Sequence, residues 1–426
     1  MLNYKQINNL TGWVVFAVAT LVYVLTVEQT ASFWDPGEFI AVAYKLQVPH
    51  PPGAPFFLLV YRMFSFFAFG DPLQVAFWMN IGSALFSSFS ILFLFWSITL
   101  FGKKLFKITE GEESKGETIT LIIPGLPSLA GSMEIFFVNS IGLPFGSGIV
   151  VFMILFFAAV FYAYKYSRKK GNAILNTALL SFIFILIGYS SYALIVVRAN
   201  QDPIINENAP KDIVSFVSYL KREQYGYRPL LHGQYFTAQL VSQEEGAPVY
   251  MKGKDKYEIV DYALENTYDP TKTTILPRVY STQESHKRLY RQKLGLREGQ
   301  DPTFGDNIYF MFSHQLGKMY WRYFMWNFSG KESDFSDAPW VGITDAFKDY
   351  PDYITENKGH NNYLMLPLLL GIIGLFFQAK VDPKSFYVNL MLFLMMGVVL
   401  VLYLNSPPVE PRERDYIYVG SFYAFA

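Results

Sequence analysis

The sequence contains no cysteine, and only 16% of its residues are charged. The first absence excludes disulfides, thiol catalysis and zinc–thiolate sites together. The second is well below the quarter of charged residues that is usual in soluble domains. Acidic and basic residues balance at a net charge of zero, so there is no basic excess to bind nucleic acid. P-loop, GxGxxG, HExxH and CxxC motifs are also missing, and we predict neither a cofactor nor a metal.

Apolar residues make up 52% of the chain and gather in long runs. Runs of about 20 such residues are long enough to cross a bilayer, which predicts a multi-pass membrane protein. The first run is longer than the core of a secretory signal peptide, so we expect a membrane helix there. None of the runs has a charge at its centre, which argues against an ion-coupled transporter. The six runs are residues 11–27, 76–101, 148–164, 173–197, 363–377 and 386–404.

Basic residues beside short loops set the expected orientation, because such residues stay in the cytoplasm. The segment between the first two runs, residues 28–75, has only Lys45 and Arg62 and should lie outside. The acidic residues Asp35 and Glu38 would then face the extracytoplasmic side. The cytoplasmic set is Lys5, Lys103, Lys104, Lys107, Arg168, Lys169, Lys170, Lys380 and Lys384.

This orientation requires an odd number of crossings between residues 105 and 147. The only candidate there is broken by Pro124, Pro127, Glu134 and Pro144, which makes a poor lipid-facing span. Either this stretch crosses in broken form, or the chain lacks helices that a longer relative has. We favour missing helices, and the apolar C-terminal stretch, RDYIYVGSFYAFA, also looks truncated.

Charge divides the chain into four expected parts. Residues 198–359 hold 20 of the 35 Lys and Arg residues and 22 of the 35 Asp and Glu residues, which predicts a water-facing extracytoplasmic α+β segment. Residues 1–107 should form two membrane helices and an outer loop. Residues 108–197 should form the broken segment and two further helices. Residues 360–426 should form two more helices and an outer EPRERDY loop.

Four stretches of the water-facing segment have readable patterns. APKDIVSFVSYLKR predicts a helix with one apolar face, and YDPTKTTILPRVYST predicts a turn, a short strand and a turn. HKRLYRQKLGLR is typical of a basic helix or of a solvated face. NIYFMFSHQLGKMYWRYFMWNFSG is typical either of an interfacial helix or of plain core packing.

Asp35 and Glu38 lie three positions apart in SFWDPGEFIAVAYKLQVPHPPGAPF, so in a helical turn they share one face. One hypothesis is structural, with Pro36 at the first helical position, Asp35 as the N-cap and Glu38 as its N3 partner. The other is catalytic, with a carboxylate general base at the membrane surface that deprotonates an acceptor hydroxyl beside a lipid-linked donor. The residues leave both hypotheses open, and the two can coexist.

His50 and the EPRERDY stretch are candidate substrate-binding residues. His50 lies in the stiff PHPPG turn and is suited to bind phosphate or to orient a carboxylate, although a lone histidine is more often a structural donor. Arg412 and Arg414, with Asp415 beside them, are suited to bidentate phosphate recognition next to the membrane. A solvated charge cluster is the alternative for these three residues.

Four stretches together resemble the bacterial branch of glycosyltransferase family 117, formerly a domain of unknown function. This branch is related to the transmembrane-protein-260-like O-mannosyltransferases. The stretches are WDPGEFIAVAYKLQVPHPPGAPFF, FFVNSIGLPFGSG, LKREQYGYRPLLHGQYF and EPRERDYIYVGSFYAFA. The resemblance implies a mainly α, polytopic helix bundle of the GT-C type in a bacterial inner membrane. It departs from the family at Pro36, where relatives have a small residue, and in the missing helices.

The same resemblance implies a polyprenyl- or dolichyl-phosphate sugar donor and transfer of mannose to protein Ser or Thr. Asp35 carries over as the catalytic residue and Glu38 as its partner, with His50, Arg412 and Arg414 as further correspondences. We expect inverting transfer in one displacement on the extracytoplasmic face. The alternatives are a transporter or flippase of lipid-linked sugar, and a non-catalytic envelope assembly protein.

Overall fold

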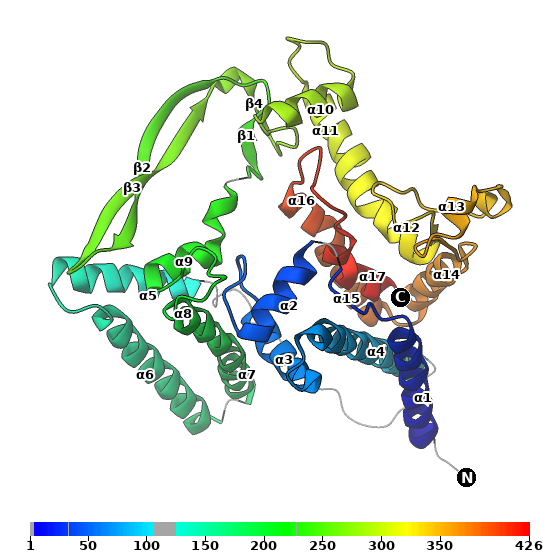
Figure 1. Cartoon of the computed structure of the whole chain (residues 1–426), viewed down its shortest axis with the longest axis horizontal. Helices are drawn as coiled ribbons and strands as arrows, with labels where there is room; N and C mark the ends of the chain where they lie inside the picture. The colour runs from blue at the N-terminus through cyan, green and yellow to red at the C-terminus, as the bar shows by residue number, and fades with distance from the viewer. Residues whose placement is uncertain (1–3, 33, 106–124, 172, 227) are drawn as a thin grey trace. The chain divides into compact units, whose positions relative to one another are not determined.

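The structure is a computed structural model that describes residues 4–32, 34–105, 125–171, 173–226 and 228–426 (Figure 1). Contacts divide the chain into two compact units. The first contains Met1–Phe93, Gly111–Tyr227 and Glu245–Leu264, and the second contains Leu94–Glu110, Arg228–Glu244 and Glu265–Ala426. Each unit is described by itself below.

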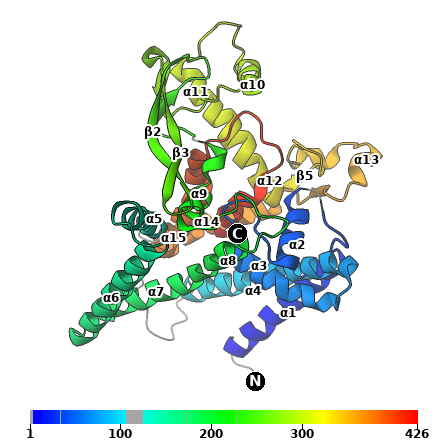
Figure 2. The ribbon, with the colours of Figure 1, turned by 60° about the vertical axis from the view of Figure 1, so that its left-hand side comes forward.

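Helices build most of the first unit, and the pairs α2 with α3, α5 with α6, and α6 with α7 pack together (Figures 1 and 2). The helix α4 begins in this unit. The helices are α1 (Tyr4–Leu25), α2 (Asp35–Lys45), α3 (Pro55–Ser65), α4 (Pro72–Leu105), α5 (Gly125–Ile135), α6 (Ser147–Lys169), α7 (Ala173–Tyr189), α8 (Ala193–Ala199) and α9 (Ile213–Lys221).

The second unit combines helices with short antiparallel strand pairs, β1 with β4 and β5 with β6. The long strands β2 (Leu240–Lys252) and β3 (Tyr257–Tyr268) pair with each other in a hairpin whose far end belongs to the first unit. The remaining elements are β1 (His232–Gln234), β4 (Thr273–Ile275), α10 (Glu284–Leu294), α11 (Phe304–Phe310), α12 (Arg322–Phe328), β5 (Gly330–Lys331), α13 (Asp352–Thr355), β6 (Asn361–Asn362), α14 (Leu366–Val381), α15 (Pro383–Leu394), α16 (Leu400–Leu404) and α17 (Val419–Phe425).

Five helical stretches of the described residues are long and apolar enough to cross a membrane: Gln6–Leu25, Pro72–Phe101, Ser147–Lys169, Leu175–Ala199 and Pro383–Leu404. The prediction of a mainly helical, polytopic fold with a smaller α+β part is therefore confirmed. The expected span at 363–377 forms α14, an apolar helix that is shorter than the five membrane-length stretches. A second short apolar helix, Pro55–Ala68, lies within the predicted outer loop. Residues 106–124, which carry Lys107 and the start of the predicted broken segment, lie outside the described residues.

Two of the four readable stretches of the segment 198–359 fold as predicted, and the basic stretch takes the helical alternative. APKDIVSFVSYLKR forms α9, where Asp212 and Ser215 make a reciprocal capping box and Phe216 is buried. The strand between two turns is β4, and the basic stretch is the helix α10. The aromatic stretch forms one continuous helical rod from α11 through a π-helical section, η6 (Met311–Trp321), to α12.

That rod is packed in a core. Of the two alternatives for its sequence, an interfacial helix or core packing, the structure therefore shows core packing. Tyr320, Tyr323 and Phe324 are at most 5% exposed. They contact Phe393 of α15, and Tyr418 and Phe422 near the C-terminal end. Aromatic side chains bury more area than any others, so this cluster is the main apolar core of the second unit.

Asn405 organises the polar centre of the second unit, directly after α16. Its side-chain amide donates to the carbonyls of Pro229 at 2.7 Å and Pro277 at 2.8 Å. Its oxygen accepts from the side chain of Gln315 at 3.0 Å, and Gln315 also donates to the Ser406 carbonyl. Asn405 is fully buried and has a φ of 42°, a left-handed conformation that asparagine tolerates better than most residues.

Replacing Asn405 with alanine should destabilise the second unit. The change leaves two buried carbonyls without donors and puts alanine at a positive φ, which together cost about 3 kcal/mol of unfolding free energy. Asn405→Gly removes the same donors without the conformational cost and should lose about 1 kcal/mol less. The measurement is the apparent melting temperature of the purified protein in detergent.

Asn266→Ala is the matched control, because Asn266 is exposed and bonds only to the exposed Gln243 side chain. A melting temperature of Asn405→Ala equal to that of Asn266→Ala would contradict the role assigned to this network.

Candidate active site

The helix α2 carries the acidic pair and begins at Asp35, with Pro36 in its first turn. It buries Val42 and Ala43 in the apolar core of the first unit. The preceding Trp34 is 65% exposed and has a φ of 71°, which an L-residue with a large side chain rarely adopts. The chain therefore turns sharply into α2 and places the two carboxylates in its first turn.

Two arginines from other helices cap the C-terminal end of α2. Arg62 of α3 donates to the Tyr44 carbonyl, and Arg198 of α8 donates to the carbonyls of Lys45 and Leu46. The last carbonyls of a helix lack partners within it and carry a partial negative charge, so a guanidinium there supplies both hydrogen bonds and charge. Arg198 therefore has a structural role at the end of α2.

The chain before α2 is tied to α4. The side-chain amide of Asn80 donates to the carbonyls of Glu28 at 2.8 Å and Thr30 at 2.9 Å. These two bonds hold the segment that leads from α1 into α2. Both ends of the acidic helix are thus positioned by contacts with distant parts of the first unit.

Glu38 and His50 form the central contact of the site. The backbone N–H of His50 donates to Glu38 Oε1 and the ring Nδ1 donates to Oε2, both at 2.8 Å. Each side chain is 29% exposed, so the pair is partly shielded from water but accessible. The ring of Phe39 lies edge-on to the imidazole at 5.3 Å between centroids.

The PHPPG turn that carries His50 is fixed on its other sides as well. The Tyr219 hydroxyl donates to the Pro49 carbonyl at 2.6 Å, and burial raises the pKa of this tyrosine. Val48 exchanges backbone hydrogen bonds with Ile205 and Glu207. Gly53 has a φ of 86°, and a side chain there would meet the Tyr219 hydroxyl at 2.6 Å. Only glycine fits this position.

These contacts test the roles that the capping hypothesis gives to Asp35 and Glu38. Asp35 is the first residue of α2 rather than the residue before it, and the N-cap position is taken by Trp34, whose side chain makes no capping hydrogen bond. Glu38 uses both carboxylate oxygens on His50 instead of on its own helix. The structural role of Glu38 is therefore a long-range tie between α2 and the proline-rich turn.

The arrangement can carry acid–base chemistry. Asp35 lies one helical turn before Glu38, so both carboxylates share a face of α2. With Nδ1–H given to Glu38, the other ring nitrogen of His50 remains to accept or donate a proton. The fixed pair can hold a neighbouring ligand in place, whereas Asp35 can take a proton from it.

In the second unit, EPRERDY is anchored by Glu413, which sequence reasoning did not single out. Its carboxylate accepts from Arg322 Nη2 at 2.7 Å, from the Tyr323 hydroxyl and from the Asp337 backbone N–H at 2.6 Å. Burial alone would raise the pKa of Glu413, but these donors hold it below its usual value. The sequence signal was Arg322 itself, a charge inside a buried aromatic run.

The predicted substrate-binding residues of EPRERDY have different surroundings. Arg414 pairs with Glu410 at 2.8 Å, and the Glu410 side chain is only 5% exposed. Arg412 donates to the Tyr416 hydroxyl at 3.0 Å and lies over its ring. Asp415 is partly exposed and begins a one-turn helix, η9 (Asp415–Tyr418). The structure thus brings together Glu38 and His50 in one unit, and Arg412, Arg414 and Asp415 in the other.

A small cavity of about 200 Å³ adjoins EPRERDY and is lined by Arg412, Lys293, Lys318 and His314 among others. His314 is 4% exposed, and its Nε2–H donates to the Pro407 carbonyl at 3.1 Å. Burial and the nearby Lys293 and Lys318 lower the pKa of His314 to about 4. The imidazole is therefore neutral over the physiological range.

The FFVNSIGLPFGSG stretch is a structural clamp in the first unit. Glu134 is 1% exposed and accepts from the backbone N–H groups of Gly146 and Ile149, at the N-terminal end of α6. A carboxylate in this position is stabilised by the helix dipole. Asn139 exchanges two hydrogen bonds with the backbone of Tyr257 at the hairpin end. Within the described ranges, no three His, Asp or Glu residues are grouped as a metal site would require.

Comparisons with known proteins support the sequence resemblance. Residues 35–197 match the family model of the protein O-mannosyl-transferase TMEM260 N-terminal domain, and residues 226–312 match a family of unknown function. Over 85 residues, or 20% of this chain, it is 32% identical to the protein O-mannosyl-transferase tmem260 of Dictyostelium discoideum and 35% identical to that of Mus musculus. The match spans 10% and 12% of the length of these relatives. No solved structure matches the chain.

The Glu38 contact predicts the tautomer of His50. Neutral His50 should carry its proton on Nδ1, because both Glu38 oxygens act as acceptors there. In Glu38→Ala the ring should shift towards the Nε2–H form that free imidazole side chains favour. Nitrogen-15 NMR of histidine-labelled protein measures this, and the chain has five histidines to assign.

His360 is the internal control for this spectrum, because its Nδ1 bonds to the Glu332 carbonyl, away from Glu38. An unchanged His50 signal in Glu38→Ala would show that the contact does not exist in solution.

The buried His314 predicts acid sensitivity of the second unit. The pKa of this histidine is 6.5 in the unfolded chain and about 4 in the folded chain. Protons therefore bind the unfolded chain first as the pH falls below 6.5, and the folded state loses stability between pH 6.5 and about pH 4. The loss is at most about 3 kcal/mol at 1.4 kcal/mol per pKa unit. Glu413 adds its own loss only below pH 4.5, because its pKa is lowered from that value.

Melting curves between pH 7 and pH 5 test this. His314→Gln should lose less stability over the window than the unmodified protein, and His232→Gln, at an exposed position, should behave like the unmodified protein. Parallel curves for His314→Gln and the unmodified protein would rule out the assignment.

Proposed function

We propose that this chain, whose residues 35–197 match the TMEM260 N-terminal domain of the protein O-mannosyl-transferases, is a membrane glycosyltransferase of that family. The proposed reaction moves mannose from a polyprenyl-phosphate donor to a Ser or Thr hydroxyl of an acceptor protein. The two matched relatives are named protein O-mannosyl-transferases. Their names support the reaction class, and the five membrane-length helices support a lipid-linked donor.

The observation that carries the proposal is the acidic turn of α2 with its fixed partner. Asp35 and Glu38 share one helical face, and Glu38 is locked to His50 by two hydrogen bonds of 2.8 Å. A site for group transfer needs a proton acceptor whose surroundings do not reorganise during the reaction. The capped helix and the clamped proline turn provide that rigidity.

In the proposed mechanism Asp35 is the general base. It accepts the proton of the acceptor hydroxyl while the hydroxyl oxygen forms a bond to the anomeric carbon of the sugar. The bond from that carbon to the phosphate oxygen breaks, and the phosphate leaves with the electron pair. One displacement inverts the anomeric centre, and no covalent intermediate on the enzyme is needed. Glu38 and His50 orient the reacting groups.

Arg412 and Arg414 are proposed to bind the donor phosphate, with Asp415 beside them. Guanidinium groups recognise phosphate oxygens in pairs, which suits both the bound donor and the departing phosphate. Arg414 faces the Glu410 carboxylate, and Arg412 lines the small cavity. We place the active face outside the cytoplasm in a bacterial inner membrane, because the segment 28–75 is poor in basic residues.

Replacing Asp35 with asparagine should abolish transfer. An amide cannot take the hydroxyl proton, and loss of a general base typically costs 10²–10⁴-fold in rate. Purified protein is incubated with polyprenyl-phosphate mannose and a Ser/Thr peptide, and the product is quantified by mass spectrometry. Asp255→Asn, an exposed aspartate in the turn of the hairpin, is the matched control and should keep full activity.

Transfer by Asp35→Asn at the unmodified rate would remove Asp35 from the mechanism. The same assay distinguishes the transporter alternative, since donor that crosses a vesicle membrane without forming product would indicate transport.

A further inference from the structure

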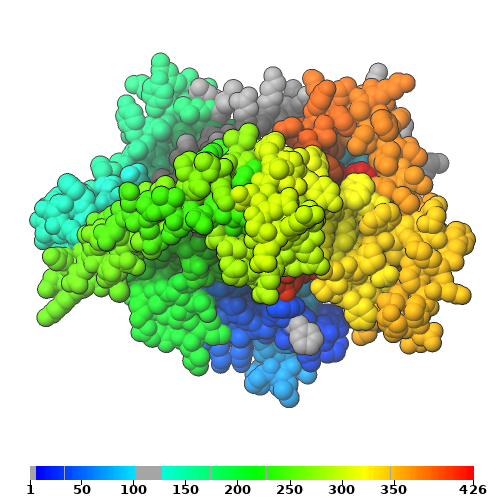
Figure 3. Space-filling view, turned by 90° about the horizontal axis from the view of Figure 1, so that it is seen from above, coloured from blue at the N-terminus to red at the C-terminus, as the bar shows by residue number. Residues whose placement is uncertain are grey.

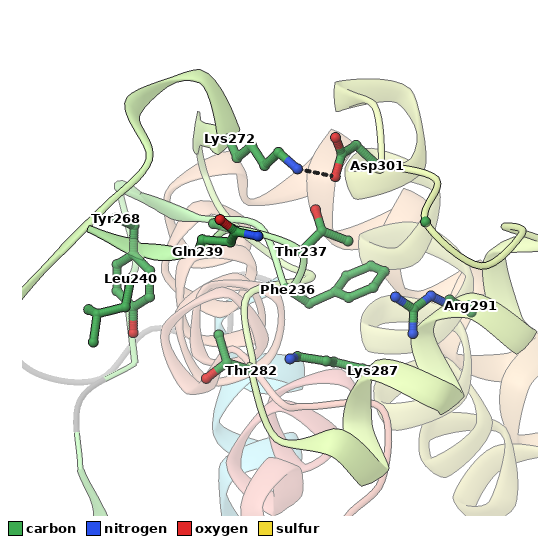
Figure 4. Close-up of a pocket in the computed structure, with 12 residues that line it drawn as sticks. Phe236, Thr237, Gln239, Leu240, Tyr268, Lys272, Thr282, Lys287, Arg291 and Asp301 are labelled. Carbon is green, nitrogen blue, oxygen red and sulfur yellow. Dashed lines mark hydrogen bonds and ion pairs between the residues drawn. The ribbon is translucent and has the colours of Figure 1, made fainter. Parts of the chain in front are cut away.

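A cavity with a volume of about 650 Å³ lies in the second unit (Figure 4). It is bounded by the start of β2, the segment after β3 and the helix α10. The cavity falls within residues 226–312, the region that matches a family of unknown function. In the space-filling view the region of α10, coloured yellow-green, lies at the surface (Figure 3).

Cationic side chains dominate the charge of this cavity. Lys272 pairs with Asp301 at 2.9 Å on one side. Lys287 and Arg291 stand four positions apart on α10, so they share one face, and both extend into the cavity (Figure 4). The only carboxylate near Lys287 in the ion pairs of the described chain is Glu284, whose side chain is 78% exposed and therefore screened by water.

Arg291 is the least satisfied of these cations. Within the described residues its side chain forms no ion pair, and its buried Nε has no hydrogen-bond partner. Its guanidinium lies 5.5 Å from the centre of the Phe236 ring, which fixes the planar group in place. A partly buried guanidinium without an ion-pair partner favours an anion that brings its own oxygens.

Neutral polar side chains surround the two cations. Thr237, Gln239 and Thr282 bring hydroxyl and amide groups to the wall, and Tyr268 adds an aromatic face with a hydroxyl. Such groups bind the hydroxyls of a polyol, whereas an apolar ligand would leave them unpaired.

The cavity is also close to the end of the membrane-length helix Pro383–Leu404. The backbone N–H of Phe236 donates to the Val279 carbonyl at 2.8 Å, and Arg278, next to Val279, donates to the Leu402 carbonyl at 2.8 Å. A ligand can therefore enter a cavity beside the end of this helix either from water or from the lipid headgroups.

We propose that this cavity binds a polyol phosphate, with the phosphate between Lys287 and Arg291 and the hydroxyls on Thr237, Gln239 and Thr282. A dissolved sugar phosphate and the phosphoglycerol headgroup of an anionic lipid both present this chemistry. The inference does not depend on the proposed transferase reaction, because it rests on the cavity alone and its test measures binding.

Calorimetry with the full purified chain in detergent tests the dissolved form, using mannose 6-phosphate and glycerol 3-phosphate as probes. Native mass spectrometry of protein from bilayers with or without phosphatidylglycerol tests the lipid form. Binding in either arm supports the site and identifies the source of the ligand. Arg291→Gln and Lys287→Gln should each weaken binding at least ten-fold.

Arg288→Gln is the matched control, because Arg288 lies on the same helix, is exposed and does not line the cavity. Two cavity variants are used so that the test still stands if one of the two misfolds. The melting temperature of each variant shows whether it is folded. Equal binding of mannose and mannose 6-phosphate, equal affinities of Arg291→Gln and the unmodified protein, or no binding in either arm would overturn the proposal.

Discussion

The Glu38 carboxylate uses both of its oxygens on His50, and this pair of hydrogen bonds determines where the turn between α2 and α3 can lie. Shielding a carboxylate from water costs free energy unless the carboxylate is hydrogen-bonded, so the two bonds from His50 also stabilise the negative charge of Glu38. Because the same bonds orient the imidazole, they fix the positions of the other candidate groups in the first turn of α2. Loss of this contact would disturb the site without touching the apolar core.

Both units use arginine to finish a helix. In the first unit, Arg62 and Arg198 cover the last carbonyls of α2. In the second, Arg278 donates to the Leu402 carbonyl and Arg228 to the Leu404 carbonyl, at the end of α16. These helix ends precede the turns with the PHPPG and EPRERDY motifs. Capping by a distant arginine therefore couples each motif to another part of its unit, and the motif is held in place by tertiary contacts.

The sequence predicted those features that depend on neighbours along the chain. Apolar runs of sufficient length marked the membrane helices, and the spacing in the basic and α9 stretches marked their helices. It did not predict partners that folding brings from far away. The sequence left a capping role open for Glu38, because its actual partner, His50, lies twelve positions away in the chain. The importance of Glu413 depends on Arg322, 91 positions earlier, and no local pattern connects them.

Several polar groups in and beside the motifs of the family resemblance are already satisfied by the protein itself. Glu134, Asn139 and Glu413 have their oxygens occupied by backbone or side-chain donors, so binding a ligand would first require breaking those bonds. These residues therefore have a structural role in this fold. Asp35 lies in the first turn of α2, and Arg412 lines the small cavity beside EPRERDY. Rigid neighbours around accessible groups are what a transfer reaction requires, since the ordering is complete before the substrate arrives.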